Sequence, residues 1–366
     1  MFKKVIFFAL NDTFDFDQIG GTDSYMRRLS RLLIGLGLEV VWVFYGSEKY
    51  SKVSCEGVSV VKFESFQDAL KYTISGGDSY LVACFLKPLD RFRMIKYRTV
   101  FRKHRIKLLS LSFFFPDTFV KKLLRMLELK LVKYDDVLCV SKRLYRFNKG
   151  IIDNSHYLPP IIPDSYFNVG FLKLSNKDKE KVVKALFLGR LDPRKGINEV
   201  ISVIESDTLT KQIRWTVSGI YIPEDPGNIA ALNRLKACDN VTFNQENRGA
   251  FSENVENRVL NFFLNNDIFI QPYRTLASTV DLPLLLLEAQ AAGCTTLTTL
   301  PEVLNNYLYD KSEAIGGDFV TQCINRLNGM TANPMAFCLD EDGLVSLQLE
   351  YSEKSIEKRL REILNG

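Results

Sequence analysis

The sequence has only two histidines, His104 and His156, and its seven cysteines are widely spaced, with no C-x-x-C pair. So few histidines leave little material for a histidine-based metal centre or for a Ser-His-Asp triad. An odd number of dispersed cysteines indicates neither a disulfide framework nor a zinc site. We therefore expect a reducing compartment, the cytoplasm, for this protein.

Long apolar segments are also missing, because no run approaches the roughly 20 residues that a membrane-spanning helix needs. The first ten residues continue into polar Asn11 and Asp12 without a small-residue cleavage site, so we interpret them as a β-strand and not as a signal peptide. Hydrophobic residues make up 46% of the chain, and 366 residues exceed what one core supports. The sequence therefore predicts two globular domains.

Strand-like and helix-like segments alternate along the chain, which predicts α/β domains with parallel sheets covered on both faces. The predicted strands cover residues 4–10, 40–45, 58–63, 80–85, 108–115 and 137–141 in the first half, and 183–188, 214–218, 241–243, 268–272 and 295–299 in the second.

Residues 159–181 interrupt the alternation with proline, asparagine, serine and lysine, and we interpret them as a linker. The predicted domains are residues 1–170 and 171–345. The closing segment, 346–366, is predicted to contain an amphipathic helix with Ile356, Leu360 and Leu364 on one side.

Charge is divided unevenly between the halves. Residues 1–170 carry 27 Lys and Arg against 17 Asp and Glu, whereas residues 171–366 carry 21 against 26. Within residues 87–107, nine basic side chains face one acidic side chain, a pattern that attracts anionic lipid. We predict peripheral binding to the inner face of the cell membrane through Arg98, Arg102 and Arg105; the alternative is a solvated helix face. Nucleic acid is not an expected partner, because no nucleic-acid-binding module is recognisable.

The segment Gly189-Arg190-Leu191-Asp192-Pro193-Arg194-Lys195-Gly196 follows a predicted strand and begins a helix. Glycines let the backbone approach a ligand, and cations at a helix N-terminus bind phosphate oxygens. The segment thus predicts an anion site that uses Arg190 and Lys195. A solvated basic turn remains the alternative.

Glu288 lies in the apolar helical segment Leu284–Gly293. A buried carboxylate is costly unless it meets hydroxyls or a cation, so this residue is a candidate for ligand binding. A capping role at the first helical turn is the alternative, but Glu288 lies too far inside the segment for it.

These two segments, in this order and separation, resemble the donor-binding half of retaining glycosyltransferases of family 4. In the first half the resemblance extends to Gly20-Gly21-Thr22 and Val140-Ser141-Lys142, and Pro301-Glu302-Val303 adds to it in the second. It implies the GT-B fold: two Rossmann-like domains facing across a cleft, with a C-terminal helix crossing back to the first.

The resemblance also implies roles for individual residues. Arg190 and Lys195 would bind the diphosphate of a nucleotide sugar, and Glu288 would bind its ribose. Catalysis would involve Arg190, Lys195 and Asp281. Further donor contacts would come from Gly20, Gly21, Gly189, Val280 and Leu282. Neither a metal nor another cofactor is implied.

Two residues typical of the family are missing. Val280 occupies the place of the first glutamate of the E-x7-E motif, with Asp281 beside it as a substitute carboxylate. A histidine expected after the strand at 108–115 is also missing, and three phenylalanines, residues 113–115, stand there. By strand alternation at least one should point inward, either as an apolar wall that favours a 6-deoxy sugar or as core.

The predicted function is transfer of a hexose from a nucleotide diphosphate sugar to a lipid-linked or glycan acceptor. Its setting would be the synthesis of bacterial surface polysaccharide, namely O-antigen, capsule or lipopolysaccharide. The alternative is a catalytically silent GT-B protein that stabilises another transferase. A nucleotide-sugar epimerase of the same fold would need further carboxylates and histidines.

Overall fold

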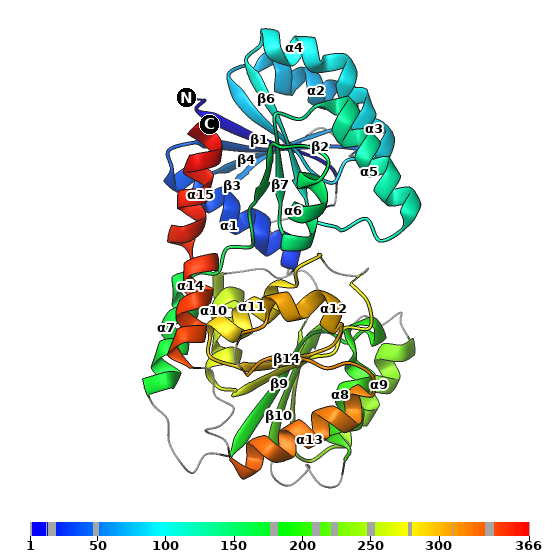
Figure 1. The fold of residues 1–366 in the computed structure, drawn as a ribbon, viewed down its shortest axis with the longest axis vertical. Coiled ribbons are helices and arrows are strands. Elements are labelled where there is room, and N and C mark those ends of the chain that lie inside the picture. Colours follow the sequence, from blue (N-terminus) through cyan, green and yellow to red (C-terminus); the bar gives the residue numbers. More distant parts are fainter. Residues whose placement is uncertain are drawn as a thin grey trace.

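The computed structural model describes residues 2–11, 13, 20–46, 51–175, 182–206, 213–220, 226–246, 253–276, 280–309, 311–333 and 340–365. Two α/β domains lie end to end in Figure 1, and each is built on one sheet. The chain passes from the first sheet to the second between residues 157 and 183.

The first sheet has the strand order β3-β4-β2-β1-β5-β6-β7-β8. Its strands are β1 (Lys4–Leu10), β2 (Glu39–Tyr45), β3 (Ser51–Cys55), β4 (Val58–Phe63), β5 (Ser79–Ala83), β6 (Ile106–Ser112), β7 (Asp136–Cys139) and β8 (Ser155–Tyr157). The accompanying helices are α1 (Gly21–Gly35), α2 (Phe66–Ser75), α3 (Pro88–Arg93), the 3-10 helix η1 (Met94–Tyr97), α4 (Arg98–Lys103), α5 (Phe119–Val132) and α6 (Lys142–Lys149). The pairings are parallel except for β3 with β4.

The second sheet is parallel, with the order β11-β10-β9-β12-β13-β14. Its strands are β9 (Val183–Arg190), β10 (Ile213–Ile220), β11 (Val241–Glu246), β12 (Ile268–Gln271), β13 (Thr295–Thr298) and β14 (Glu313–Ala314). The helices are α7 (Asp164–Ser175), α8 (Ile197–Ile204), α9 (Pro226–Lys236), α10 (Glu253–Leu264), α11 (Leu284–Ala291), α12 (Pro301–Leu304) and α13 (Phe319–Ala332), with the 3-10 helices η2 (Pro193–Lys195) and η3 (Asn305–Tyr307).

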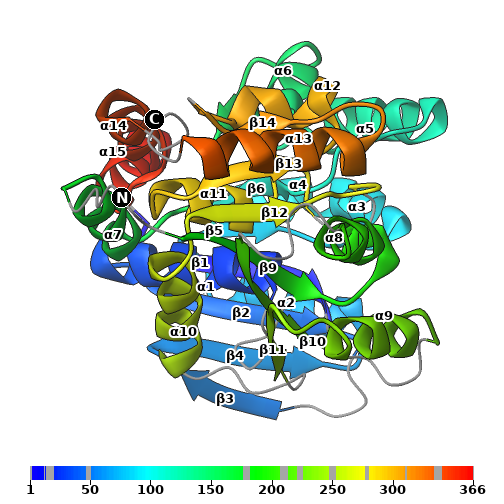
Figure 2. The same ribbon diagram turned by 90° about the horizontal axis from the view of Figure 1, so that it is seen from below.

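Apolar side chains cover both faces of each sheet. The central strand β1 is buried from Val5 to Ala9 without alternation, as expected of a parallel strand between two helical layers. In the second domain, α8, α9 and α13 pack on one face, and α7, α10 and α11 pack on the other (Figure 2).

The strand order places a switch point in each sheet. Strand β1 lies between β2 and β5, and β9 lies between β10 and β12, so successive connections leave these strands in opposite directions. Ligands of open α/β sheets bind outside the carboxyl ends of the strands at such points. The two ends face one another, because Asp281 N–H donates to the Phe113 carbonyl after β6 (3.0 Å), and a Cβ on Gly21, after β1, would lie 3.9 Å from Leu284.

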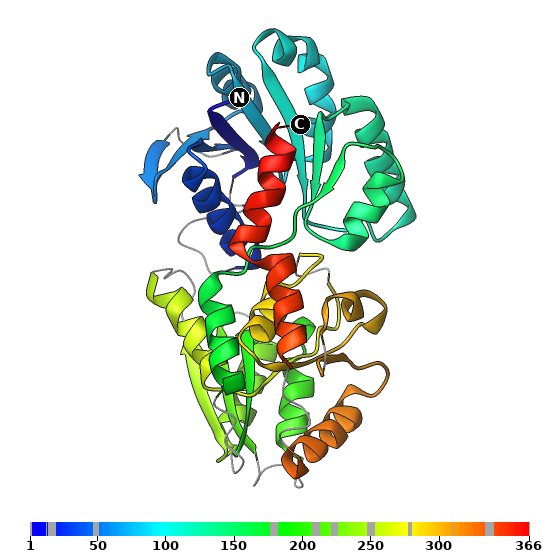
Figure 3. The same ribbon diagram turned by 60° about the vertical axis from the view of Figure 1, so that its left-hand side comes forward.

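The chain ends in two helices that connect the domains. Helix α14 (Glu341–Tyr351) packs on α7 and α11 of the second domain. Helix α15 (Glu353–Asn365) returns along the first domain (Figure 3), where Ile356 and Leu360 join its core and the Tyr80 hydroxyl donates to the Leu364 carbonyl at 2.5 Å. The predicted crossing of the C-terminal helix is confirmed.

The predicted strands are present with small shifts of their ends, while the short strands β3, β8 and β14 were not predicted. The linker interpretation of residues 159–181 is wrong for residues 164–175, which form α7 because Tyr166 and Phe167 are buried against the second-domain core. The domain boundary predicted after residue 170 falls within this helix. Within the described residues, no helix is both long and apolar enough to cross a bilayer.

Candidate active site

The loop after β9 lies at the switch point of the second sheet. Gly196 has φ of 79°, and a Cβ there would come within 2.8 Å of the Pro272 carbonyl carbon, so a glycine is required. The Asp192 carboxylate accepts from the Arg194 N–H at 2.8 Å and caps η2. These contacts turn the chain sharply from β9 into α8 and hold the loop against the end of β12.

Two half-buried cations come together in this loop. The Lys195 ammonium lies over the Tyr273 ring, 4.8 Å from its centroid, and Arg190 lies 3.7 Å from Asp192. Burial, followed by the proximity of Arg190, lowers the pKa of Lys195 to about 8. A bound anion would relieve both effects, which is the electrostatic character of a phosphate site.

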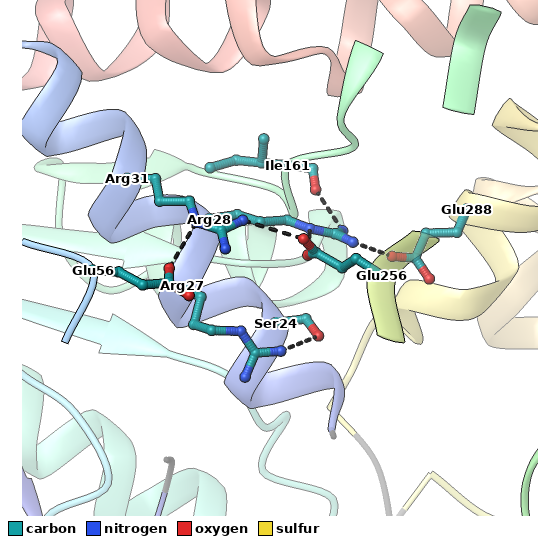
Figure 4. Close-up of polar contacts among 8 residues, drawn as sticks. All are labelled: Ser24, Arg27, Arg28, Arg31, Glu56, Ile161, Glu256 and Glu288. Atoms are coloured by element: carbon teal, nitrogen blue, oxygen red, sulfur yellow. Dashed lines mark hydrogen bonds and ion pairs between the residues drawn. The ribbon is translucent and has the colours of Figure 1, made fainter. Parts of the chain in front are cut away.

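Glu288 is buried on α11 and faces the first domain. Its Oε1 accepts from Arg28 Nη2 of α1 at 2.6 Å, and the exposed fractions of the two side chains are 4% and 3% (Figure 4). Arg28 also donates to the Ile161 carbonyl (3.0 Å) and to Glu256 of α10 (3.2 Å). This arginine thus links three segments: α10, α11 and the connection between the domains.

The electrostatics of this cluster depend on Arg28. Burial raises the pKa of Glu288, and the ion pair with Arg28 opposes this only in part. Burial also acts to raise the pKa of Glu256, but Arg28 and Arg31 outweigh it and hold that pKa below its usual value. Since the ion pair uses Oε1 of Glu288, its Oε2 can still accept from a ligand hydroxyl.

Asp281 also connects the domains. Its carboxylate accepts from the Ser141 hydroxyl and from the Arg143 guanidinium, and Arg143 lies 4.0 Å above the Phe115 ring. Both carboxylate oxygens are therefore held by first-domain partners. Val280, where the family has a glutamate, packs with the first-domain core.

The comparisons with known proteins agree with this geometry. Residues 171–313 match the family model of glycosyl transferases group 1. The match lies in the second half of the chain and covers less than half of its length. No curated protein sequence matches the chain.

Solved structures share the fold of the whole chain. Sucrose-phosphate synthase from Thermosynechococcus elongatus has a TM-score of 0.69 at 12% identity, covering 99% of this chain and 98% of that one. HepE of Anabaena, solved with UDP and glucose, has a TM-score of 0.69 at 9% identity over 100% of both chains. WaaG, a glycosyltransferase involved in lipopolysaccharide biosynthesis, has a TM-score of 0.61 at 15% identity over 99% and 100%. The chain has the GT-B fold, and together these findings support a glycosyltransferase.

In this GT-B protein the predicted donor residues lie in two segments of the second domain and at the start of α1 in the first domain. Arg190 and Lys195 share one loop. Burial and then the negative charge of Glu288 raise the pKa of Tyr273, whose ring lies beneath the Lys195 ammonium. On the opposite side of the domain boundary, Gly20 is the N-cap of α1 and Gly21 its first residue, and a Cβ on Gly21 would lie 3.9 Å from Leu284. The buried side chain of Leu282 packs in the second-domain core. Among the described residues, no group of His, Cys, Asp and Glu could hold a metal ion.

The predicted membrane residues lie elsewhere in the GT-B fold. Arg98 makes a double contact with Asp135 at 3.0 and 3.1 Å, and Arg105 pairs with Asp78 at 3.0 Å. Arg102 is exposed in the last turn of α4. Helix α4 lies at the far end of the first domain from the second (Figure 1).

Sequence reasoning missed Arg28, Arg143 and Glu256. A signal for Arg28 existed, because it lies three residues after Tyr25 and four before Leu32, inside the apolar stripe of α1. Charged residues in such a stripe require a buried partner. Arg143 and Glu256 gave no comparable signal, since both lie in segments rich in charge.

Proposed function

We propose that this protein is a retaining hexosyltransferase that takes a nucleotide diphosphate sugar as donor and a lipid-linked or glycan acceptor. The observation that carries this proposal is the meeting of Arg190 and Lys195 at the switch point of the second sheet. Glu288 lies beside the same site and supplies an acceptor for ribose hydroxyls. HepE, with the same fold, was solved with UDP, which supports a nucleotide as the ligand of this fold.

The proposed chemistry needs positive charge where the sugar–phosphate bond breaks. The departing phosphate oxygen gains negative charge in the transition state, and Arg190 and Lys195 stabilise it without a metal ion. That oxygen accepts the proton of the attacking acceptor hydroxyl as the new glycosidic bond forms on the same face of the sugar. The configuration of the sugar carbon is thereby retained.

The proposed acceptor binds against the first domain, near the carboxyl ends of β1 and β6. Gly21 and Phe113 lie there and contact the second domain. We place the activity at the anionic inner face of the cell membrane, in surface polysaccharide synthesis, a role for which WaaG provides a precedent on the same fold.

A catalytically silent protein is the second candidate. Asp281, the substitute for the missing glutamate, has both carboxylate oxygens engaged by Ser141 and Arg143. A silent protein would bind the nucleotide and stabilise a partner transferase, but would release no nucleoside diphosphate from any nucleotide sugar. Measuring that release across a panel of sugars separates the two candidates.

Recognition of ribose by Glu288 tests the donor site. We expect one of UDP, GDP and ADP to bind in isothermal titration calorimetry, and its 2′-deoxy analogue to bind about 10-fold or more weakly, because Oε2 of the buried Glu288 carboxylate is then left without a hydrogen bond. Glu288→Gln should reduce the preference for ribose, whereas Glu341→Ala, on exposed α14, should not. Equal binding of the ribo and deoxy forms would refute this role.

The lowered pKa of Lys195 predicts a pH dependence of binding. A bound diphosphate favours the charged ammonium and raises its pKa above about 8, so binding takes up a proton. Affinity for the nucleotide should therefore fall as the pH rises from about 7 to about 9.5, by up to about tenfold per unit. Lys195→Arg keeps its charge over this range and should give a flat profile; an unchanged slope in that variant would contradict the assignment.

A further inference from the structure

Helix α5 carries most of its apolar residues on the side that faces solvent. The exposed fractions of these side chains run from 40% for Leu127 to 80% for Phe119. The exposed apolar face consists of Phe119, Val120, Leu123, Leu124, Leu127 and Leu131. A single exposed apolar side chain needs no explanation, but six on one helix of 14 residues form a contiguous patch.

The spacing makes this patch a continuous stripe. Residues 119, 123, 127 and 131 follow one another at intervals of four, and residues 120 and 124 form the adjacent row. In a water-soluble domain a stripe of this kind is normally the face that packs on the core.

The inner side of α5 buries only Leu129 and Val132 of its apolar residues in the first-domain core, beside a polar network. Buried Glu128 accepts from Arg125 (2.6 Å), from Arg91 of α3 (3.0 Å) and from the Tyr134 hydroxyl (2.8 Å). Arg125 also donates to the Ser112 hydroxyl at the end of β6. Because this network holds the helix in place, the outward direction of its apolar face is built into the fold.

Most charges around the apolar face are positive; exposed Asp117, which pairs with Lys121 at 2.7 Å, is negative. Exposed lysines on or next to α5 are Lys121, Lys122, Lys130 and Lys133. Exposed Lys96 lies on η1, which packs against α5. A face with apolar residues and lysines complements an anionic lipid surface, whereas contact between two such faces in a dimer would bring the lysines of both copies together.

We propose that α5 docks on an anionic lipid bilayer, with its apolar face in the headgroup region and its lysines on the lipid phosphates. This moves the membrane contact from Arg98, Arg102 and Arg105 to α5. It deepens the proposed function, on which it rests for the lipid-linked acceptor. Only five residues separate Phe113, whose carbonyl accepts from the Asp281 N–H at the domain boundary, from Phe119, so the docked face begins one short loop away from that boundary.

Vesicle flotation with the whole chain tests this docking. Vesicles of phosphatidylcholine alone should retain little protein, and vesicles with about 30% phosphatidylglycerol should retain it in a salt-sensitive manner. The double variant Leu123→Ser/Leu127→Ser should bind these vesicles at least about tenfold more weakly, since less apolar area is buried. Leu349→Ser, on an exposed leucine of α14, is the matched control and should bind as the unchanged protein does.

Three results would overturn the proposal. One is wild-type protein that does not float with anionic vesicles; another is a double variant that floats as well as wild type. The third is a wild-type dimer in light scattering that the double variant dissociates, since α5 would then be an interface between copies. A loss of flotation in Arg102→Glu but not in the double variant would return the contact to α4. Retained nucleotide binding in the double variant shows that it is folded and separates this test from that of the donor site.

Discussion

Replacing Lys195 by alanine is expected to lower kcat/KM by about 10²- to 10³-fold while leaving the fold intact, because a preorganised cation at the leaving phosphate is lost. Arg190→Ala should have an effect of the same order. Both side chains are half-buried in a loop whose shape depends on Gly196 and Asp192, so truncating either leaves the backbone contacts in place.

The measurement is the steady-state release of nucleoside diphosphate from the preferred donor, with binding of the free nucleotide measured alongside. Lys236→Ala, on an exposed lysine at the end of α9, is the matched control and should retain full activity. If Lys195→Ala and Arg190→Ala both retain nucleotide affinity and turnover, the diphosphate does not bind in this loop.

Replacing Arg28 by alanine should destabilise the protein by about 3–5 kcal/mol, because it leaves Glu288 buried without its partner. Arg31→Ala is the matched control: Arg31 is one turn away on α1 and pairs with Glu56 and Glu256, but its side chain is partly exposed. Its loss should cost less than about 1 kcal/mol. Urea unfolding followed by circular dichroism gives both values.

The loss in Arg28→Ala should depend on pH. Without the guanidinium, the folded-state pKa of Glu288 rises further above that of the unfolded chain. A carboxyl group with a raised pKa destabilises the fold as the pH rises through its unfolded value, so the loss should shrink toward pH 5. Adding Glu288→Gln to Arg28→Ala should recover part of the stability. Equal losses in Arg28→Ala and Arg31→Ala would show that the buried ion pair contributes little.

Local patterns predicted the fold and the anion loop well. The central strands are apolar runs that end at a glycine or a polar residue. Such a run can be recognised as a strand from its own residues, without knowledge of contacts with distant parts of the chain. The Gly189–Gly196 loop was predictable because the carboxyl end of a parallel strand and the start of the next helix are adjacent in sequence. Residues 164–175 were interpreted as a linker because proline, asparagine, serine and lysine are frequent in and around them. Half of the segment is nevertheless apolar or aromatic, and Tyr166 and Phe167 anchor α7 in the second-domain core.

Contacts across the domain boundary could not be predicted in the same way. Arg28 and Glu288 are 260 positions apart, and Arg143 and Asp281 are 138 apart. A single sequence shows that a buried charge needs a partner but not which residue supplies it. The orientation of α5 could not be predicted in this way either. Its apolar stripe is visible in the sequence, but the side that faces solvent is set by the contacts of Glu128 with Arg91 and Tyr134 and by the burial of Leu129 and Val132.

The alternation of side-chain direction along a strand correctly predicted the orientation of one phenylalanine after β6. Phe113 is buried, stacked on Phe85 at 4.7 Å and in edge contact with Tyr25 at 5.1 Å, while Phe114 is exposed. The inward turn of one ring is thus confirmed. The tight aromatic packing of Phe113 fits a core role. Its carbonyl accepts from the Asp281 N–H, which places the residue at the domain boundary.

The most direct test of the proposed donor site is a crystal structure of the protein with the nucleoside diphosphate that binds best among UDP, GDP and ADP. We expect a diphosphate within hydrogen-bonding distance of Arg190 and Lys195, and a ribose hydroxyl on the Glu288 carboxylate while Oε1 keeps its contact with Arg28. A nucleotide bound away from the Gly189–Gly196 loop, or no binding of any of the three, would contradict it.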